Sequence, residues 1–146
     1  MVELAALIDE SRISLGIEVD CSKALFRCVS ELLSPLSGVD AKEIAAALSE
    51  RERMGTTAVG DGVSIPHARL DSIAEPQAFL LRLDHPIDMD AIDDQPVDIF
   101  FVLLVPKEAD NDHLRVLSRI ARVIRQPNNL LMIRRSTAAA EVAALF

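Results

Sequence analysis

The stretch VDIFFVLLV, residues 97–105, is apolar at every position except Asp98. A strand with one face in water alternates apolar and polar residues, so a run with almost no alternation predicts a strand that is buried on both faces. A sheet built around such a strand needs helices to cover it. The sequence on either side of residues 97–105 therefore has to supply both the neighbouring strands and these helices.

Two helices are predicted before this strand. Between residues 20 and 37, apolar residues recur at intervals of three and four, which is typical of one face of an amphipathic helix. They are Ala24, Leu25, Cys28, Val29, Leu32, Leu33 and Leu36. Pro35 predicts that this helix ends about there. A second helix is predicted from Ala41 to about Arg53, with Asp40 as its N-cap and Gly55 as the glycine that ends it.

Short strands are predicted around a glycine-rich turn. Residues 56–59 and 63–66 flank the sequence Gly60-Asp61-Gly62, where glycine supplies positive φ angles without steric cost. The two pieces should therefore form a small hairpin. Residues 78–83 alternate enough to predict another strand.

The C-terminal part predicts a third helix that starts near Asp110 or Asn111 and stops before Pro127. Its apolar stripe comprises Leu114, Leu117, Ile120, Ala121 and Ile124. Two short helical pieces, 130–135 and 137–145, complete the chain. Helices and strands in this order, without a regular βαβ repeat, predict an α/β fold. We expect a single-domain sandwich over residues 1–146, with a mixed and mostly buried β-sheet flanked by helices.

Composition limits the classes of function. A chain of 146 residues, half of them apolar, can bury one sizeable core. Fifteen basic and 23 acidic residues give a formal charge of −8, which repels nucleic-acid phosphates and anionic lipid. The longest apolar run, residues 99–105, is far too short to cross a bilayer, and the N-terminus carries acids where a secretory signal carries basic residues. We expect a cytoplasmic protein that binds neither nucleic acid nor membrane.

Cysteine and metal chemistry are not indicated. Cys21 and Cys28 lie seven positions apart in a predicted helix, about 10 Å at 1.5 Å per residue, which is too far for a disulfide. The three histidines, His67, His85 and His113, show none of the spacings that hold a metal on one face. The aspartate-rich residues 84–98 lack the glycine and glutamate of a calcium-binding EF-hand loop. We therefore predict no metal and no cofactor.

One histidine has unusual surroundings. Residues 52–69 read ERMGTTAVGDGVSIPHAR, so that small residues and then Pro66 precede His67. Because proline lacks an N–H, strand pairing should stop there and present His67 at a strand end, open to solvent or to a partner. From these residues alone, a functional histidine and a structural one both remain open.

The same residues resemble a known family. The pattern Glu52, Val59-Gly60 and Val63-Ser64-Ile65-Pro66-His67-Ala68 is similar to the phosphorylation motif of the IIA components of the phosphoenolpyruvate-dependent phosphotransferase system, fructose and mannitol class. The family usually has alanine where this chain has Ser64. The similarity continues through ERERMGTT, IDMDAIDDQPVDIFFVLLVP, DNDHLRVLSRIARVIR and the N-terminal LAALIDESRISLGI, and is strongest to the nitrogen-regulatory branch.

The resemblance implies roles for three residues. His67 would accept a phosphoryl group from HPr or its nitrogen-branch homologue, and Arg51 and His113 match supporting positions. A neutral imidazole is a good nucleophile near pH 7, and a guanidinium can fork onto two phosphoryl oxygens. On the residues alone, Arg51 could instead be a solvated arginine at a helix end and His113 a surface residue at a helix start. His85 matches no family position.

Three functions are compatible with a soluble chain of this size: a regulatory phosphocarrier, a transport subunit and a metal-dependent hydrolase. A regulatory phosphocarrier would bind target proteins differently in its two phosphorylation states, whereas a transport subunit would pass the phosphoryl group to a separate IIB subunit and then to a sugar. The sequence contains no IIB-like reactive cysteine loop, which favours regulation. A metal-dependent hydrolase has no set of ligands to support it.

Overall fold

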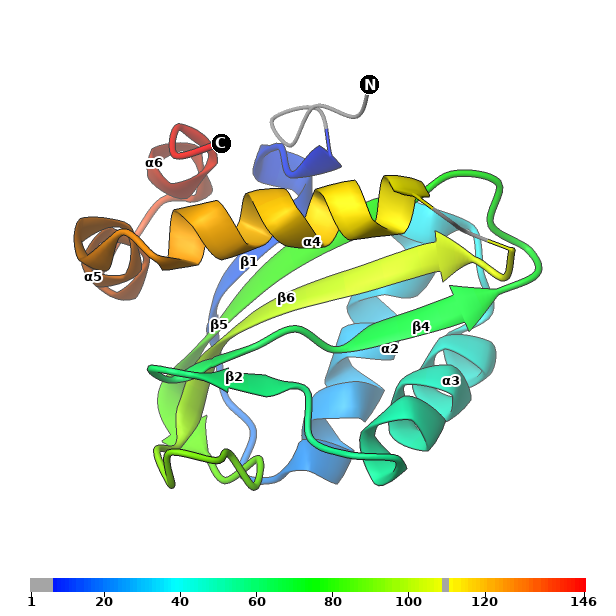
Figure 1. The fold of residues 1–146 in the computed structure, drawn as a ribbon, viewed down its shortest axis with the longest axis horizontal. Helices are drawn as coiled ribbons and strands as arrows, with labels where there is room; N and C mark the ends of the chain where they lie inside the picture. Colours follow the sequence, from blue (N-terminus) through cyan, green and yellow to red (C-terminus); the bar gives the residue numbers. More distant parts are fainter. Residues whose placement is uncertain (1–6, 109–110) are drawn as a thin grey trace.

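The computed structural model describes residues 7–108 and 111–146, apart from the side chains of residues 111–114. A mixed six-stranded sheet runs in the order β1-β5-β6-β3-β2, with β4 also paired to β6 (Figure 1). The strands are β1 (Ile13–Ile17), β2 (Ala58–Gly60), β3 (Val63–Ser64), β4 (His67–Leu70), β5 (Gln77–Ile87) and β6 (Val97–Pro106). The pairs β1·β5, β3·β6 and β4·β6 are parallel, and β2·β3 and β5·β6 are antiparallel.

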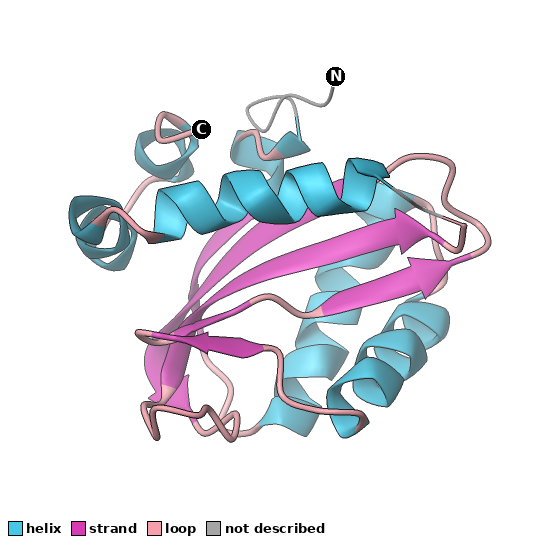
Figure 2. Cartoon of the chain, viewed as in Figure 1, coloured by secondary structure: helices cyan, strands magenta, loops and turns pink. Residues whose placement is uncertain are grey.

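Helices cover both faces of this sheet (Figure 2). One face carries α2 (Ser22–Ser37) and α3 (Ala41–Arg53), and the other carries α4 (Asn111–Ile124), α5 (Pro127–Arg135) and α6 (Ala139–Ala143). A short 3-10 helix, η1 (Glu10–Arg12), precedes β1. None of the helices in the described residues has the length and apolarity that crossing a membrane requires. The predicted fold class, an α/β sandwich with a mixed sheet, is confirmed.

Strand β6 separates two apolar cores. Phe100, Val102 and Leu104 belong to the core under α2 and α3, whereas Phe101, Leu103 and Val105 belong to the core under α4 to α6. All six are at most 1% exposed. At roughly 1.5 to 3 kcal/mol for each buried large apolar side chain, these six side chains contribute about 9 to 18 kcal/mol of hydrophobic stabilisation. The interpretation of residues 97–105 as a strand buried on both faces is confirmed.

The predicted hairpin is present, and its turn has positive φ angles of 103°, 56° and 78° at Gly60, Asp61 and Gly62. The expectation that pairing stops after Pro66 is wrong, because β4 begins at His67 and pairs with the same strand as β3. Proline removes only an N–H donor, and the Pro66 carbonyl still accepts from the Leu103 N–H at 2.9 Å. The interruption between β3 and β4 is therefore only two residues long.

Helix α2 ends at Ser37, two residues past Pro35 and about where predicted, because a proline this close to the end removes one hydrogen bond and Gly38, at φ 77°, supplies a left-handed cap. Its buried stripe is narrower than predicted, since Leu32 and Leu36 are 38% and 41% exposed. Helix α3 has the predicted bounds and Asp40 as N-cap residue, but the Asp40 side chain makes no capping hydrogen bond.

Candidate active site

His67 lies at the first position of β4, opposite Leu103 of the central strand β6. Its side chain is half-buried, and Nδ1 lies 3.1 Å from the carbonyl oxygen of Ile65. Ile65 lies in the interruption between β3 and β4, where its carbonyl can accept a hydrogen bond from the histidine ring. The backbone therefore fixes the orientation of the ring.

Arg51, in the last turn of α3, reaches the other ring nitrogen. Its Nε–H donates to His67 Nε2 over 3.0 Å, and its Nη1 donates to the carbonyl of Gly55 over 2.8 Å. Because a guanidinium carries only donors, Nε2 must be the acceptor and the ring proton must be on Nδ1. Nδ1–H then donates to Ile65. The geometry selects a neutral imidazole whose nucleophilic nitrogen is Nε2.

The electrostatics agree with this protonation state. Burial lowers the pKa of His67 below its ordinary value, and the positive charges of Arg51 and Arg69 lower it further. The hydrogen bond to Ile65 and the charge of Glu52 act in the opposite direction but do not reverse the shift. His67 is therefore neutral at pH 7.

A buried polar network joins the segment before His67 to the end of α3. Thr57 donates from its N–H to Glu52 Oε2 over 2.9 Å and from Oγ1 to Glu52 Oε1 over 2.6 Å. The Ser64 hydroxyl is fully buried and lies 2.8 Å from Thr57 Oγ1. Since the single proton of Thr57 is used on Glu52, Ser64 must be the donor to Thr57. This is how the chain satisfies the hydroxyl at a position where the resembling family usually has alanine.

This network has a direct consequence for the site. Glu52 follows Arg51 in α3, and Ser64 lies three residues before His67. The hydrogen bonds therefore hold the arginine-bearing helix turn against the strand that leads to the histidine. The sequence pattern marks Glu52 and Ser64 as parts of a motif, and Thr57 only as one of the small residues before His67 that allow another chain to come close. Nothing in a polar pair such as Thr56-Thr57 distinguishes a buried bridge from a solvated loop.

The other two histidines are placed differently. His113 lies in the first turn of α4, but its side chain is outside the described part of the structure, so its supporting role beside the site remains a prediction. His85, which matches no family position, is exposed on β5. Among the described side chains, no group of three His, Cys, Asp or Glu residues is arranged to hold a metal ion.

The chain is similar to proteins of one family. The family model described as phosphoenolpyruvate-dependent sugar phosphotransferase system, EIIA 2, matches residues 6–146. A nitrogen regulatory protein of Bradyrhizobium diazoefficiens is 37% identical over 130 residues, which are 89% of this chain and 85% of the relative. One from Pseudomonas aeruginosa is 36% identical over 125 residues, covering 85% and 81% of the two chains.

Solved structures agree. The crystal structure of nitrogen regulatory protein IIA-Ntr from Neisseria meningitidis superposes with a TM-score of 0.91, at 33% identity and with 97% of each chain covered. Mannitol IIA from Escherichia coli has a TM-score of 0.80 at 16% identity, covering 94% of this chain and 96% of that one, which shows a shared fold. With a family model that spans nearly the whole sequence, this chain belongs to the EIIA type 2 family of the phosphoenolpyruvate-dependent sugar phosphotransferase system.

Proposed function

We propose that this protein is a histidine phosphocarrier with a regulatory role, and that it accepts a phosphoryl group on Nε2 of His67. The observation that carries the proposal is the contact of Arg51 Nε with His67 Nε2 at 3.0 Å. This contact leaves the lone pair on Nε2 and places a guanidinium where the phosphoryl oxygens would arrive. The donor we propose is HPr or its nitrogen-branch homologue, which places the protein in the cytoplasm.

The transfer balances without a cofactor. The Nε2 lone pair attacks phosphorus, a new N–P bond forms, and the bond to the donor histidine breaks with its electron pair returning to the donor ring. The ring proton stays on Nδ1, which donates it in a hydrogen bond to the Ile65 carbonyl throughout. Arg51 has to release Nε2 and turn onto the phosphoryl oxygens, where a fork of two N–H donors stabilises their charge. We propose that His113 supplies a further donor to the same oxygens.

The regulatory role is favoured by the identity of the relatives that cover most of the chain. The nitrogen regulatory proteins of Bradyrhizobium diazoefficiens and Pseudomonas aeruginosa are 37% and 36% identical over 85% or more of this chain. A fructose-specific EIIABC component of Bacillus subtilis is 28% identical over 84% of it, and a fructose-specific EIIA component of Haloferax volcanii is 44% identical over only 58%. The alternative is a fructose or mannitol transport subunit that passes the phosphoryl group to a separate IIB. The mannitol IIA of Escherichia coli has been solved in complex with its phosphorylated IIB, and at 16% identity the likeness to it extends only to the fold.

A labelling experiment tests the acceptor residue. The protein is incubated with phosphoenolpyruvate, the first enzyme of the system and either carrier, and the phosphate is located by mass spectrometry. We expect one acid-labile phosphate on His67, none in His67→Ala, and full labelling in the control variant His85→Ala. Undiminished labelling of His67→Ala would contradict the assignment.

A second arm separates the two roles. Phosphorylated protein is mixed with purified IIB subunits of the fructose and mannitol systems, and transfer to IIB is followed by the loss of phosphate from His67. The regulatory role predicts that the phosphate stays on His67. Rapid transfer to either IIB would establish the transport alternative.

A further inference from the structure

The positive charge of this chain is concentrated in one segment. Residues 115–135 contain six of the 15 basic residues, all of them arginine, and no aspartate or glutamate. The rest of the chain has nine basic residues against 23 acidic ones. These 21 residues form most of α4 and all of α5, so the molecule has a basic side on an otherwise strongly acidic surface.

An open groove lies on this basic side, between the C-terminal half of α4, α5 and the β2–β3 turn. Its volume is about 880 Å³, and its lining includes the apolar residues Val59, Ile65, Ile124 and Leu131. Val59 is 56% exposed and Leu131 is 44% exposed, which leaves apolar surface in contact with water. The charged residues that line it are Asp61, Arg125 and Arg134. His67 is not among the lining residues.

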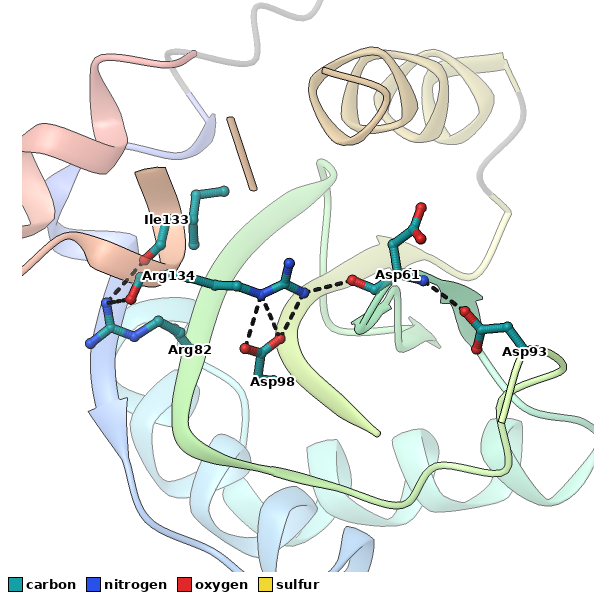
Figure 3. Close-up of polar contacts among 6 residues, drawn as sticks. All are labelled: Asp61, Arg82, Asp93, Asp98, Ile133 and Arg134. Atoms are coloured by element: carbon teal, nitrogen blue, oxygen red, sulfur yellow. Dashed lines mark hydrogen bonds and ion pairs between the residues drawn. The ribbon is translucent and has the colours of Figure 1, made fainter. Parts of the chain in front are cut away.

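The walls of the groove are fixed by an arginine network (Figure 3). Arg134 of α5 contacts both carboxylate oxygens of Asp98, at 3.0 and 2.9 Å, and donates to the carbonyl of Asp61 at 2.6 Å. Asp61 lies in the β2–β3 turn, where its N–H donates to Asp93 over 2.9 Å. Arg82 of β5 donates to the carbonyl of Ile133, near the end of α5, over 2.9 Å. The groove is therefore preformed, which reduces the ordering cost of binding.

Other arginines on this side are available to a partner. Arg122, Arg125 and Arg135 are exposed, and among the described side chains none of the three forms an ion pair. Arg122 lies in the last turn of α4, and Arg125 follows the helix directly, with its N–H still bonded to the Ala121 carbonyl. Their side chains are therefore neighbours, and Arg125 lines the groove. Arg134, by contrast, is already paired with Asp98 and serves as part of the wall.

We propose that this groove docks an acidic amphipathic helix of a partner protein, at a site separate from His67. The apolar floor fits a stripe of leucine-like side chains, and the arginine edge fits the carboxylates beside such a stripe. A nucleic acid offers no stripe of apolar side chains to fill the floor of the groove. A carrier that is basic around its own histidine would be repelled by the arginines. The site does not depend on phosphoryl transfer.

The probe is a fluorescent 18-residue peptide with leucine at positions i, i+3, i+4 and i+7 and glutamate at most others. One control peptide carries lysine in place of glutamate, and another has the same composition in scrambled order. Binding is measured by anisotropy at physiological salt, and the site is mapped by amide shifts of the labelled protein. We expect binding of the glutamate peptide alone, with shifts in α4, α5 and the β2–β3 turn.

Matched variants locate the charge. Arg122→Glu/Arg125→Glu should weaken binding at least tenfold, whereas Lys23→Glu/Arg27→Glu, with the same charge change on exposed positions of α2, should leave it within twofold. Leu131→Ala should also weaken binding, because it removes apolar floor while keeping all charges. Circular dichroism and phosphate labelling of His67 check that each variant is folded. A variant that binds the peptide but is no longer labelled would concern the phosphocarrier proposal and not the docking site.

Several results would overturn the proposal. They are equal binding of the scrambled peptide, equal losses in the two double variants, and shifts that fall outside the groove. Tighter binding of a 20-nucleotide single strand or of phosphatidylserine vesicles than of the glutamate peptide would assign the basic side to a different class of partner.

Discussion

At the scale of single residues, the site depends on keeping one imidazole neutral. The pKa of His67 is lowered most by burial and further by the charges of Arg51 and Arg69, so the neutral form of the ring persists as the pH falls below the ordinary value of about 6.5. Because the folded-state pKa is below the unfolded one, the unfolded chain binds more protons between the two values. The contribution of His67 to the stability of the folded state is therefore complete above about pH 6.5, and it is lost as the pH falls through this window.

This balance predicts a titration result. Arg51→Ala removes one positive charge next to the ring but leaves the burial, so the pKa of His67 should rise toward its ordinary value without reaching it. The imidazole Cε1–H signals of His67 and His85 can be followed together by NMR, with His85 as the internal control. An unchanged or lower pKa of His67 in the variant would show that the Arg51 contact is absent in solution.

Arg51 should also matter for the rate of phosphorylation. Removal of a preorganised donor at a site of developing charge typically slows a reaction by about 10²- to 10³-fold, and we expect a loss of about 10²-fold or more for Arg51→Ala. Arg53→Ala is the matched control, because Arg53 ends the same helix but is exposed and paired with Glu50. If Arg51→Ala and Arg53→Ala are phosphorylated at rates within twofold of each other, Arg51 is an ordinary solvated arginine at a helix end.

At the scale of elements, the β2–β3 turn has a left-handed backbone and also contacts the side chain of Arg134. A Cβ at Gly62 would lie 2.5 Å from Arg134 Nη2 and 3.1 Å from Asp98 Oδ1, and φ is +78°. Gly38 has nearly the same φ, +77°, with nothing within 4 Å of a Cβ. In both alanine variants, the left-handed conformation should lower the free energy of unfolding by about 1 to 2 kcal/mol. Gly62→Ala should lower it further, because the added Cβ displaces Arg134 from its ion pair with Asp98. Urea unfolding of the two variants gives the difference, and equal losses would mean that Arg134 moves aside without cost.

Elements with a strong local signal were predictable. Residues 97–105, the helix ending at Arg53 and the helix stopping before Pro127 all carry long apolar patterns or clear end signals. Strand β1 was not predicted, because it is five residues long and forms only by parallel pairing with β5, more than 60 residues away. Strand β4 was missed for a related reason, since Pro66 is a local stop signal that the distant β6 overrides.

The candidate site likewise combines a residue with a local sequence signal and contacts that form only through the fold. His67 could be singled out from the residues before it, but the contact with Arg51 depends on α3 and β4 packing together across a loop and a hairpin. The residue pattern alone left Arg51 as a solvated helix end, and the family resemblance supplied its role. The bridge from Ser64 through Thr57 to Glu52 had no sequence signal, because its three polar residues become neighbours only when the hairpin folds back on α3.

At the scale of the whole molecule, the charges divide the surface into two sides. Six arginines lie in residues 115–135, whereas four aspartates, Asp88, Asp90, Asp93 and Asp94, lie in the loop between β5 and β6. Thr56 Oγ1 donates to the carbonyl of Met89 over 2.6 Å, which ties this acidic loop to the segment between Arg51 and His67. Glu52, Asp88 and Asp90 line a shared depression there, together with Arg53. The family resemblance implies a carrier that is basic around its own histidine, and we propose that such a carrier approaches His67 from the side of this loop.

This division predicts how phosphorylation responds to salt. A carrier steered by opposite charge associates more slowly as salt screens the approach over roughly 8 to 10 Å, while the chemical step inside the complex is little affected. The rate at low carrier concentration should therefore drop severalfold between low and high salt, and the rate at saturating carrier should change little. Asp88→Asn/Asp90→Asn should reduce the low-salt rate more than Glu10→Gln/Glu31→Gln, which removes the same charge far from the site. A low-concentration rate that is indifferent to salt would mean that apolar contact dominates docking and that the acidic loop does not guide the carrier.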